Sequence, residues 1–215
     1  MSRAVRVVDY GVGNLLSVAR AIEHCGARVQ LADRAADIAG AAMLVLPGVG
    51  AFADGMAELR LRRLDQPVID FAKSGKPLLG ICLGMQMLLS ASEEFGEHAG
   101  LGIIPGRVKA VPPVGVDGRP HKIPHIGWNA LQLPRGVTSW HKTILQGIAP
   151  GATVYFVHTY TAIPDSADHR LADCDYDGQL LSASLRSGMV FGCQFHPEKS
   201  GHVGLKVLEN FLGMA

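Results

Sequence analysis

Apolar and polar positions follow two periods along the first half of the chain, and these periods predict strands and helices in turn. Residues 4–9, AVRVVD, are mostly apolar, and this pattern is typical of a buried strand. Residues 15–26 then place apolar side chains at the helical spacing and end at Gly26, a common helix stop signal. Residues 28–32 and 41–48 repeat the strand pattern. This alternation predicts a mostly parallel sheet with helices on both faces.

The next segment predicts two further helical stretches and one strand. Residues 52–73 have helical periodicity in two pieces, which we expect Pro67 to separate because proline interrupts a helix interior. Residues 76–81, KPLLGI, are typical of a short buried strand. Residues 83–94, LGMQMLLSASEE, predict the helix that follows it.

The second half of the chain predicts β structure. Gly and Pro become frequent from about residue 101, and three later segments have the pattern of strands: residues 152–160, 180–187 and 189–198. We expect them to add antiparallel or mixed strands to the same sheet, followed by a C-terminal helix from about Val203. The fold class is therefore predicted to be α/β, with a mostly parallel central sheet, helices on both faces and added antiparallel strands. No repeat or linker divides the chain, so residues 1–215 are expected to form one domain.

Composition excludes several classes of function. The chain is 48% hydrophobic and 18% charged with a formal net charge of +1, so it has no electrostatic footprint for nucleic acid or an anionic membrane. It contains no apolar run of about 18 residues and no secretory signal at its start, which favours a cytoplasmic location. Its four cysteines include no C-x-x-C pair, which argues against a disulfide framework and a structural zinc site.

Cys82 stands between Gly80 and Gly84, where the predicted strand gives way to the predicted helix. Loops at the carboxyl ends of parallel strands form the ligand crevice of such folds. A nucleophile on a sharp strand-to-helix turn has a strained backbone and needs small residues two positions before and after it. The N–H of Leu83 could then face a developing oxyanion. Alternatively, Cys82 is a small apolar residue in a glycine-lined packing contact, and the pattern alone leaves both interpretations open.

Two histidines follow predicted strands and are candidates for a base. His196 precedes Pro197 and Glu198, and in an extended segment residues 196 and 198 point to the same side. A carboxylate against one ring nitrogen would orient the imidazole while the other nitrogen takes the thiol proton. His158 has no carboxylate neighbour and is the weaker candidate. An ordinary turn after a strand is the alternative for the H-P-E segment.

Two motifs together resemble a known family. The segments GICLGMQ and QFHPE are similar to the nucleophile and base motifs of the triad (class I) glutamine amidotransferase domains. Further segments resemble the glutaminase subunits of imidazole glycerol phosphate synthase, which act in histidine biosynthesis: DYGVGN at 9–14, LPGVGAF at 46–52, HIGWN at 125–129, YFVHTY at 155–160 and HPEKSG at 196–201.

The resemblance implies roles for individual residues. Cys82 would attack the carboxamide of glutamine, His196 would protonate the departing ammonia and later activate water, and Glu198 would orient His196. The backbone N–H groups of Val49 and Leu83 would form the oxyanion hole, after a backbone flip in the Pro47–Gly48–Val49–Gly50 segment. Residues implied in substrate binding are Gly48, Gly50, Gln86, Glu94, His158 and Thr159, although a solvated helix-end charge is the alternative for Glu94 and a tight strand-end turn for residues 47–50.

The resemblance also implies a partner. Ammonia released to water is mostly protonated and no longer nucleophilic, so a dry route to an acceptor is needed. The implied acceptor is a (βα)8-barrel cyclase subunit, HisF, which would form a heterodimer with this chain. Asn14, Tyr155 and Lys199 would lie at that interface, Lys199 through a salt bridge, although each could be an ordinary surface residue. No metal or organic cofactor is expected.

Two other functions remain open. The chain could be a triad glutaminase that serves another synthase, such as anthranilate or pyridoxal phosphate synthase. It could also be a non-catalytic regulatory module of the same fold, which the intact set of Cys82, His196 and Glu198 disfavours.

Overall fold

The fold is built around a seven-stranded sheet. The computed structural model describes residues 4–214, and the strand order in this sheet is β11-β12-β13-β4-β3-β1-β2. The five strands from β13 to β2 are parallel, and β11 and β12 are antiparallel additions at one end. This confirms the predicted fold class. The strands are β1 (Ala4–Val8), β2 (Arg28–Ala32), β3 (Leu44–Gly48), β4 (Leu78–Cys82), β11 (Arg170–Tyr176), β12 (Gln179–Ser187) and β13 (Val190–Cys193).

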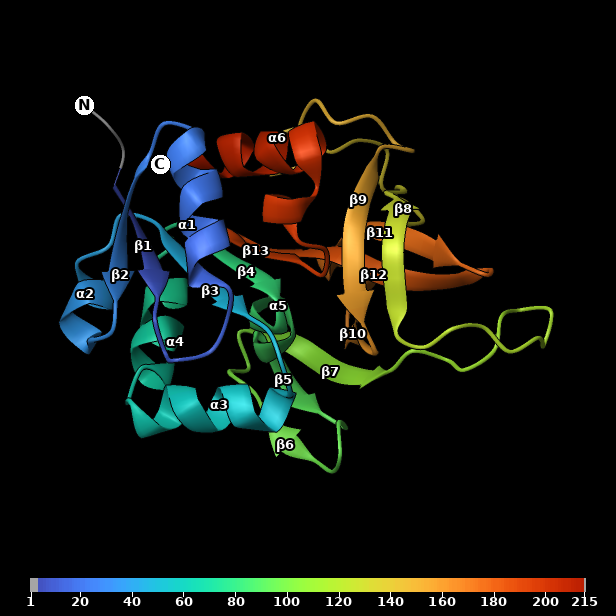
Figure 1. Ribbon diagram of the computed structural model, residues 1–215, viewed down its shortest axis with the longest axis horizontal. Helices are drawn as coiled ribbons and strands as arrows, with labels where there is room; N and C mark the ends of the chain where they lie inside the picture. Colours follow the sequence, from blue (N-terminus) through green and yellow to red (C-terminus); the bar gives the residue numbers. More distant parts are fainter. Residues whose placement is uncertain (1–3, 215) are drawn as a thin grey trace.

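Helices cover both faces of this sheet (Figure 1). Helices α1 (Leu15–His24) and α6 (Gly201–Leu212) lie on one face, and α2 (Ala35–Ala39), α3 (Phe52–Leu61) and α4 (Asp65–Lys73) lie on the other. Alternate residues of β3 supply the two cores, because Val45 packs with the first group and Leu44 and Leu46 pack with the second. Within residues 4–214, no helix is long and apolar enough to cross a membrane.

Two smaller sheets flank the main one. The first has the order β10-β7-β5-β6 and is formed by β5 (Leu89–Ser92), β6 (His98–Ala99), β7 (Ile104–Ala110) and β10 (Tyr160–Pro164). The second is an antiparallel pair of β8 (His125–Ala130) and β9 (Thr153–His158). The prediction that all later strands extend the main sheet is therefore wrong for the segment 152–160, because β9 pairs with β8 and β10 with β7.

The two helices between residues 52 and 73 are confirmed, but the break between them lies at residues 62–64 and not at Pro67. Pro67 is the third residue of α4. Proline is tolerated there because the first N–H groups of a helix have no partner within it. The break between α3 and α4 therefore comes about one helical turn before the proline that was expected to cause it.

The helix predicted over residues 83–94 is much shorter in the structure. α5 covers Leu83–Met87 only, and β5 follows it almost at once. The backbone N–H groups of Leu101 and Ile103 donate to the carbonyls of Met87 and Leu88, at 2.9 Å each. Since these partners lie more than ten residues away in the chain, local periodicity could not reveal that they compete with the helix.

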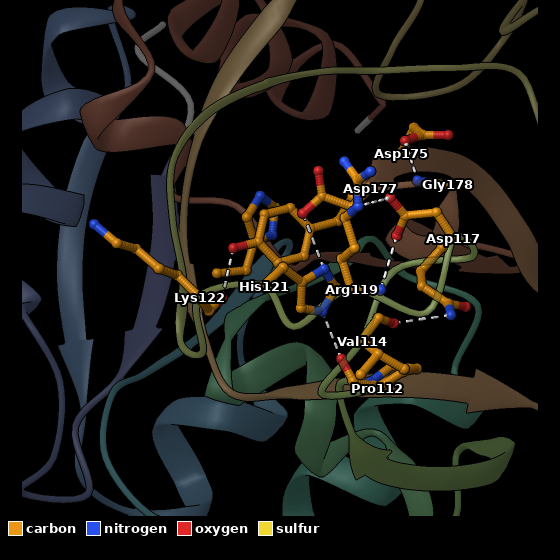
Figure 2. Close-up of polar contacts among 12 residues, drawn as sticks. Pro112, Val114, Asp117, Arg119, His121, Lys122, Asp175, Asp177 and Gly178 are labelled. Atoms are coloured by element: carbon orange, nitrogen blue, oxygen red, sulfur yellow. Dashed lines mark hydrogen bonds and ion pairs between the residues drawn. The ribbon is translucent and has the colours of Figure 1, made fainter.

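The segment between β7 and β8 extends away from the sheets and is tied to the β11–β12 hairpin by polar contacts (Figures 1 and 2). The ring nitrogens of His121 lie 3.0 Å from a carboxylate oxygen of Asp177 and 2.6 Å from the carbonyl oxygen of Pro112. The N–H of Val116 donates to the Asp177 carbonyl at 3.0 Å. These contacts position Pro124, at the end of the segment, against the cavity described below.

We expect Gly204→Ala to lower the free energy of unfolding by about 2 kcal/mol, although alanine favours helices by about 1 kcal/mol over glycine. A Cβ at this position of α6 would overlap with the carbonyl oxygen of Pro197. Urea unfolding followed by circular dichroism measures the change. His202→Ala, at an exposed position of the same helix, is the control and should change stability by less than about 0.5 kcal/mol. Equal stability of both variants would contradict the close packing of α6.

Candidate active site

The candidate site lies where three parallel strands end. Cys82 is the last residue of β4 and pairs in register with Gly48, the last residue of β3. On the other side of β4, Ile81 pairs with Cys193 at the end of β13, and the chain continues from there to His196. The parallel register thus brings three separate sequence motifs to one edge of the sheet.

The backbone at Cys82 has the strained geometry expected of a nucleophile turn. Its φ of 53° and ψ of −112° lie outside the regions that non-glycine residues normally occupy. The flanking glycines leave no space for side chains: a Cβ on Gly80 would lie 2.8 Å from the backbone of Gly84, and a Cβ on Gly84 would overlap with the carbonyl oxygen of Leu46. Both glycines are therefore needed for α5 to begin directly against the sheet.

The other three cysteines lie in environments that favour the neutral thiol. Burial, followed by the charges of nearby carboxylates, raises the pKa of Cys174 to about 12. Burial is also the main reason why the pKa values of Cys25 and Cys193 are raised. A neutral thiol is a poor nucleophile, so none of these three competes with Cys82 for a catalytic role.

His196 and Glu198 form a buried pair. Nδ1 of His196 lies 2.7 Å from Oε1 of Glu198, and both side chains are less than 5% exposed. The carboxylate accepts the Nδ1 hydrogen, which leaves Nε2 as the reactive nitrogen. Within residues 4–214, buried Nε2 has no hydrogen-bond partner. A short 3₁₀ turn, η2 (Pro197–Lys199), holds the pair in place, and the Ser200 hydroxyl donates to the His196 carbonyl at 2.6 Å.

The charge balance around His196 favours its protonated form. Burial works against the charged ring, but the attraction of the Cys82 sulfur and of the Glu198 carboxylate outweighs burial and raises the pKa of His196 to about 9. The imidazolium is therefore the main form at neutral pH and can donate a proton to a leaving group.

His158 is not equipped to act as the base. Its Nδ1 donates to the carbonyl of Tyr160 at 2.9 Å, and its Nε2 accepts from Nδ1 of His125 at 2.9 Å. Burial is the main cause that lowers the pKa of both histidines to about 4. Because both ring nitrogens of His158 are engaged, the geometry favours His196 over His158.

A cavity of about 280 Å³ opens beside Cys82. Among the residues predicted from the sequence, its lining includes Val49, Gly50, Cys82, Leu83, Gln86, Glu94, His158, Thr159 and His196. Gly48 does not line it but lies next to Leu83, which does, because a Cβ on Gly48 would be 3.0 Å from the Cβ of Leu83. The predicted substrate residues thus converge on one space next to the thiol.

Glu94 and Gln86 are held firmly in the cavity wall. Glu94 is 9% exposed, and its Oε2 accepts the backbone N–H of Phe52, at the start of α3, at 2.6 Å. It is therefore not the solvated helix-end charge considered as an alternative. The side-chain amide of Gln86 donates to the Gln194 side chain at 2.9 Å and to the Tyr160 carbonyl at 3.1 Å.

Sequence reasoning missed four residues at this site. Gln194 is fully buried, and its amide nitrogen lies 3.8 Å from the Cys82 sulfur. Its place two residues before His196 was the available signal. Pro124, Val157 and Tyr160 also line the cavity. Val157 and Tyr160 lie within the YFVHTY segment, but the motif does not show which of its residues reach the cavity. The pairing of β8 with β9 brings Pro124 and Val157 there.

The residues predicted at a partner interface lie near one another. Nζ of Lys199 is 6.0 Å from the ring centroid of Tyr155. Asn14 begins α1, where its side chain accepts the Ser17 N–H at 3.3 Å, and α1 packs against the η2 turn that contains Lys199. The three residues therefore occupy one region, close to His196.

The comparisons with known proteins agree with this geometry. The family model for class I glutamine amidotransferases matches residues 6–214. The imidazole glycerol phosphate synthase subunit HisH 1 of Legionella pneumophila (strain Lens) is 54% identical over 209 residues, which cover 97% of this chain and 98% of that protein. HisH of Moorella thermoacetica is 44% identical, with coverage of 97% and 94%. The solved structure of PurLQS from Thermotoga maritima has the same fold, with a TM-score of 0.72 at 19% identity and 99% coverage of both chains. The chain therefore belongs to the class I glutamine amidotransferase family and, within it, to the HisH subunits of imidazole glycerol phosphate synthase.

Proposed function

We propose that this chain hydrolyses glutamine to glutamate and ammonia with Cys82, His196 and Glu198, and passes the ammonia to a cyclase subunit in histidine biosynthesis. The observation that carries the proposal is the strained turn at Cys82, which opens on the same cavity as the buried His196–Glu198 pair. The extent of the match to HisH subunits supports the choice of pathway.

The first half of the reaction forms a thioester. The Cys82 thiolate attacks the carboxamide carbon of glutamine, and the carbonyl oxygen becomes an oxyanion that the N–H groups of Leu83 and Val49 stabilise. When the tetrahedral intermediate collapses, the His196 imidazolium gives its proton to the departing nitrogen, and ammonia leaves. Glu198 orients His196 and stabilises the imidazolium through the bond at 2.7 Å.

The second half releases glutamate. Neutral His196 takes a proton from a water molecule, whose oxygen attacks the thioester carbon, and the Cys82 sulfur leaves as the thiolate. The sum is glutamine plus water to glutamate plus ammonia. Gln194 donates toward the sulfur from 3.8 Å and would stabilise the thiolate at both stages.

The ends of the substrate have matching groups in the cavity. The Glu94 carboxylate is the partner we assign to the α-ammonium of glutamine, because it is buried and its position is fixed by Phe52. The backbone of the segment His158–Thr159 would hold the α-carboxylate end. Gln86, whose amide hydrogens are donated to Gln194 and Tyr160, would form the wall beside it. The neutral state of His158 and His125 keeps additional positive charge away from the ammonium.

The proposed partner is the (βα)8-barrel cyclase HisF, with the complex in the cytoplasm. HisF would convert its ribonucleotide to imidazole glycerol phosphate and an aminoimidazole carboxamide ribotide. Ile126 and Trp128 of β8 are 58% and 57% exposed and lie on the same face of the pair as Tyr155. Lys199 adds a cation next to Tyr155, and Asn14 would lie at the margin of the same surface. We assign this surface to the cyclase.

A glutaminase for anthranilate or pyridoxal phosphate synthase is the second candidate. The same triad would serve it, so the chemistry of Cys82 does not discriminate. Growth of a histidine auxotroph that lacks its own glutaminase subunit does, because only a subunit that docks on the cyclase would restore growth at low ammonia.

We expect Cys82→Ala to abolish glutamine hydrolysis while it leaves binding to the cyclase unchanged, since the variant removes the nucleophile and no surface group. Glutamate release and analytical ultracentrifugation measure the two properties. Cys25→Ala is the matched control and should keep full activity, because Cys25 lies outside the cavity. Turnover by Cys82→Ala would exclude the proposed mechanism.

We expect kcat/KM for glutamine to fall as the pH rises through about 9, because the pKa of His196 is raised to about 9 and its protonated form is lost above that value. Glu198→Gln removes an attraction that favours the imidazolium, so it should move this fall to lower pH as well as reduce kcat. A pH–rate profile of both proteins tests the assignment. An identical alkaline limb in the variant would contradict the role of Glu198.

A further inference from the structure

Tyr10 is a buried polar residue next to the site that the mechanism above does not use. It follows β1 and is 0% exposed, within the core on the α3 side of the sheet. Its hydroxyl donates to the carbonyl oxygen of Pro47 at 2.7 Å. Pro47 begins the PGVG segment that supplies the proposed Val49 donor of the oxyanion hole.

The Tyr10 hydroxyl also limits the space around Gly48. A Cβ on Gly48 would overlap with this hydroxyl and would lie 3.1 Å from the backbone nitrogen of Gly84. Gly48 is therefore held between Tyr10 on one side and the start of α5 on the other. The peptide between Pro47 and Gly48 has little freedom to rotate, because its carbonyl is bonded and its Cα is enclosed.

The other end of the segment is anchored as well. The N–H of Phe52 donates to Glu94 at 2.6 Å, and Phe52 is fully buried. Between the two anchors, Val49 is 40% exposed and Gly50 has a φ of 103°, a conformation that glycine adopts readily. Motion of the backbone is thus restricted at both ends and is concentrated around the Gly48–Val49 peptide.

The phenol of Tyr10 remains a hydrogen-bond donor at every working pH. Burial and, to a smaller extent, the nearby Cys82 sulfur raise its pKa well above the ordinary value. The bond to Pro47 is therefore a permanent constraint and does not switch with pH.

We propose that Tyr10 is a positioning residue for glutamine hydrolysis: its hydroxyl fixes the Pro47 carbonyl, so that the adjoining Gly48–Val49 peptide can present the Val49 N–H to the oxyanion. This inference rests on the proposed glutaminase function and adds a residue that acts through the backbone of the PGVG segment. Tyr10 itself would touch neither the substrate nor the thiol.

The test compares Tyr10→Phe, which deletes one oxygen atom, with the unmodified chain, each in complex with the cyclase subunit. Thr143→Val is the matched control, because it also removes a buried hydroxyl that donates to a carbonyl, that of Trp140, at 2.6 Å and lies outside the cavity. Four properties are measured for each protein: the melting temperature, the steady-state constants for glutamine, amide hydrogen exchange in peptides that cover residues 47–52, and the rate at which iodoacetamide alkylates Cys82.

In Tyr10→Phe, we expect kcat to fall about tenfold or more with KM changed less than about threefold, because the lost contact serves the transition state. Exchange in residues 47–52 should become faster. Alkylation of Cys82 should keep its rate, since displacement of iodide forms no oxyanion. Thr143→Val should resemble the unmodified chain in kcat, exchange and alkylation, even where its melting temperature drops.

Three results would overturn the proposal. Unchanged exchange in Tyr10→Phe would show that the hydroxyl does not restrain the segment, whatever the activity. Faster exchange with unchanged kcat would show that the restraint has no catalytic effect. Equal losses of kcat in Tyr10→Phe and Thr143→Val would indicate general destabilisation. An unmodified complex that does not hydrolyse glutamine would instead contradict the proposed function, while the exchange comparison would still test the restraint.

Discussion

The contact between α5 and the end of β3 is the constraint on which the site depends. Gly84 lies so close to the carbonyl of Leu46 that no side chain fits between them, and this close approach forces the chain to turn sharply at Cys82. The strained backbone of Cys82 is maintained because β4 is paired on both sides and fully buried. The same contact places the start of α5 beside Gly48, so the thiol and both proposed oxyanion donors are positioned together.

A second constraint comes from the other neighbour of β4. The register between β4 and β13 brings the QFHPE segment beside the thiol. His196 and Glu198 are both buried there, so each is the hydrogen-bond partner that water cannot supply to the other. A buried imidazolium would be costly alone, and the carboxylate and the sulfur offset that cost. The neighbouring pair His125–His158 lacks a carboxylate on its own ring nitrogens and stays neutral. The His196–Glu198 pair therefore favours a charged imidazole and the His125–His158 pair a neutral one. Only the first pair suits proton transfer.

The parts of this arrangement that the sequence predicts are those with local causes. The glycines around Cys82 are required by one turn, and the spacing of His196 and Glu198 is set within another. Each motif is local, so both could be recognised without a structure. The β5 strand could not be, because its pairing with β7 and the bonds from residues 101–104 override a helical pattern. Tyr10 was missed for the same reason, since its partner Pro47 is distant in the chain. Gln194 has a local signal in its place two residues before His196, but its contact with Cys82 joins distant parts of the chain. Their contacts with the site form only when the sheet is assembled.

We propose that this site produces ammonia for an acceptor on another polypeptide. The most direct test of this proposal is glutamate release from glutamine by the purified chain, first alone, then with the cyclase subunit, and finally with the cyclase subunit and its ribonucleotide substrate. We expect strong stimulation in the full mixture, because docking and ligand binding would fix the PGVG segment in its active geometry. Full activity without any partner, or no glutamate release in any mixture, would contradict it.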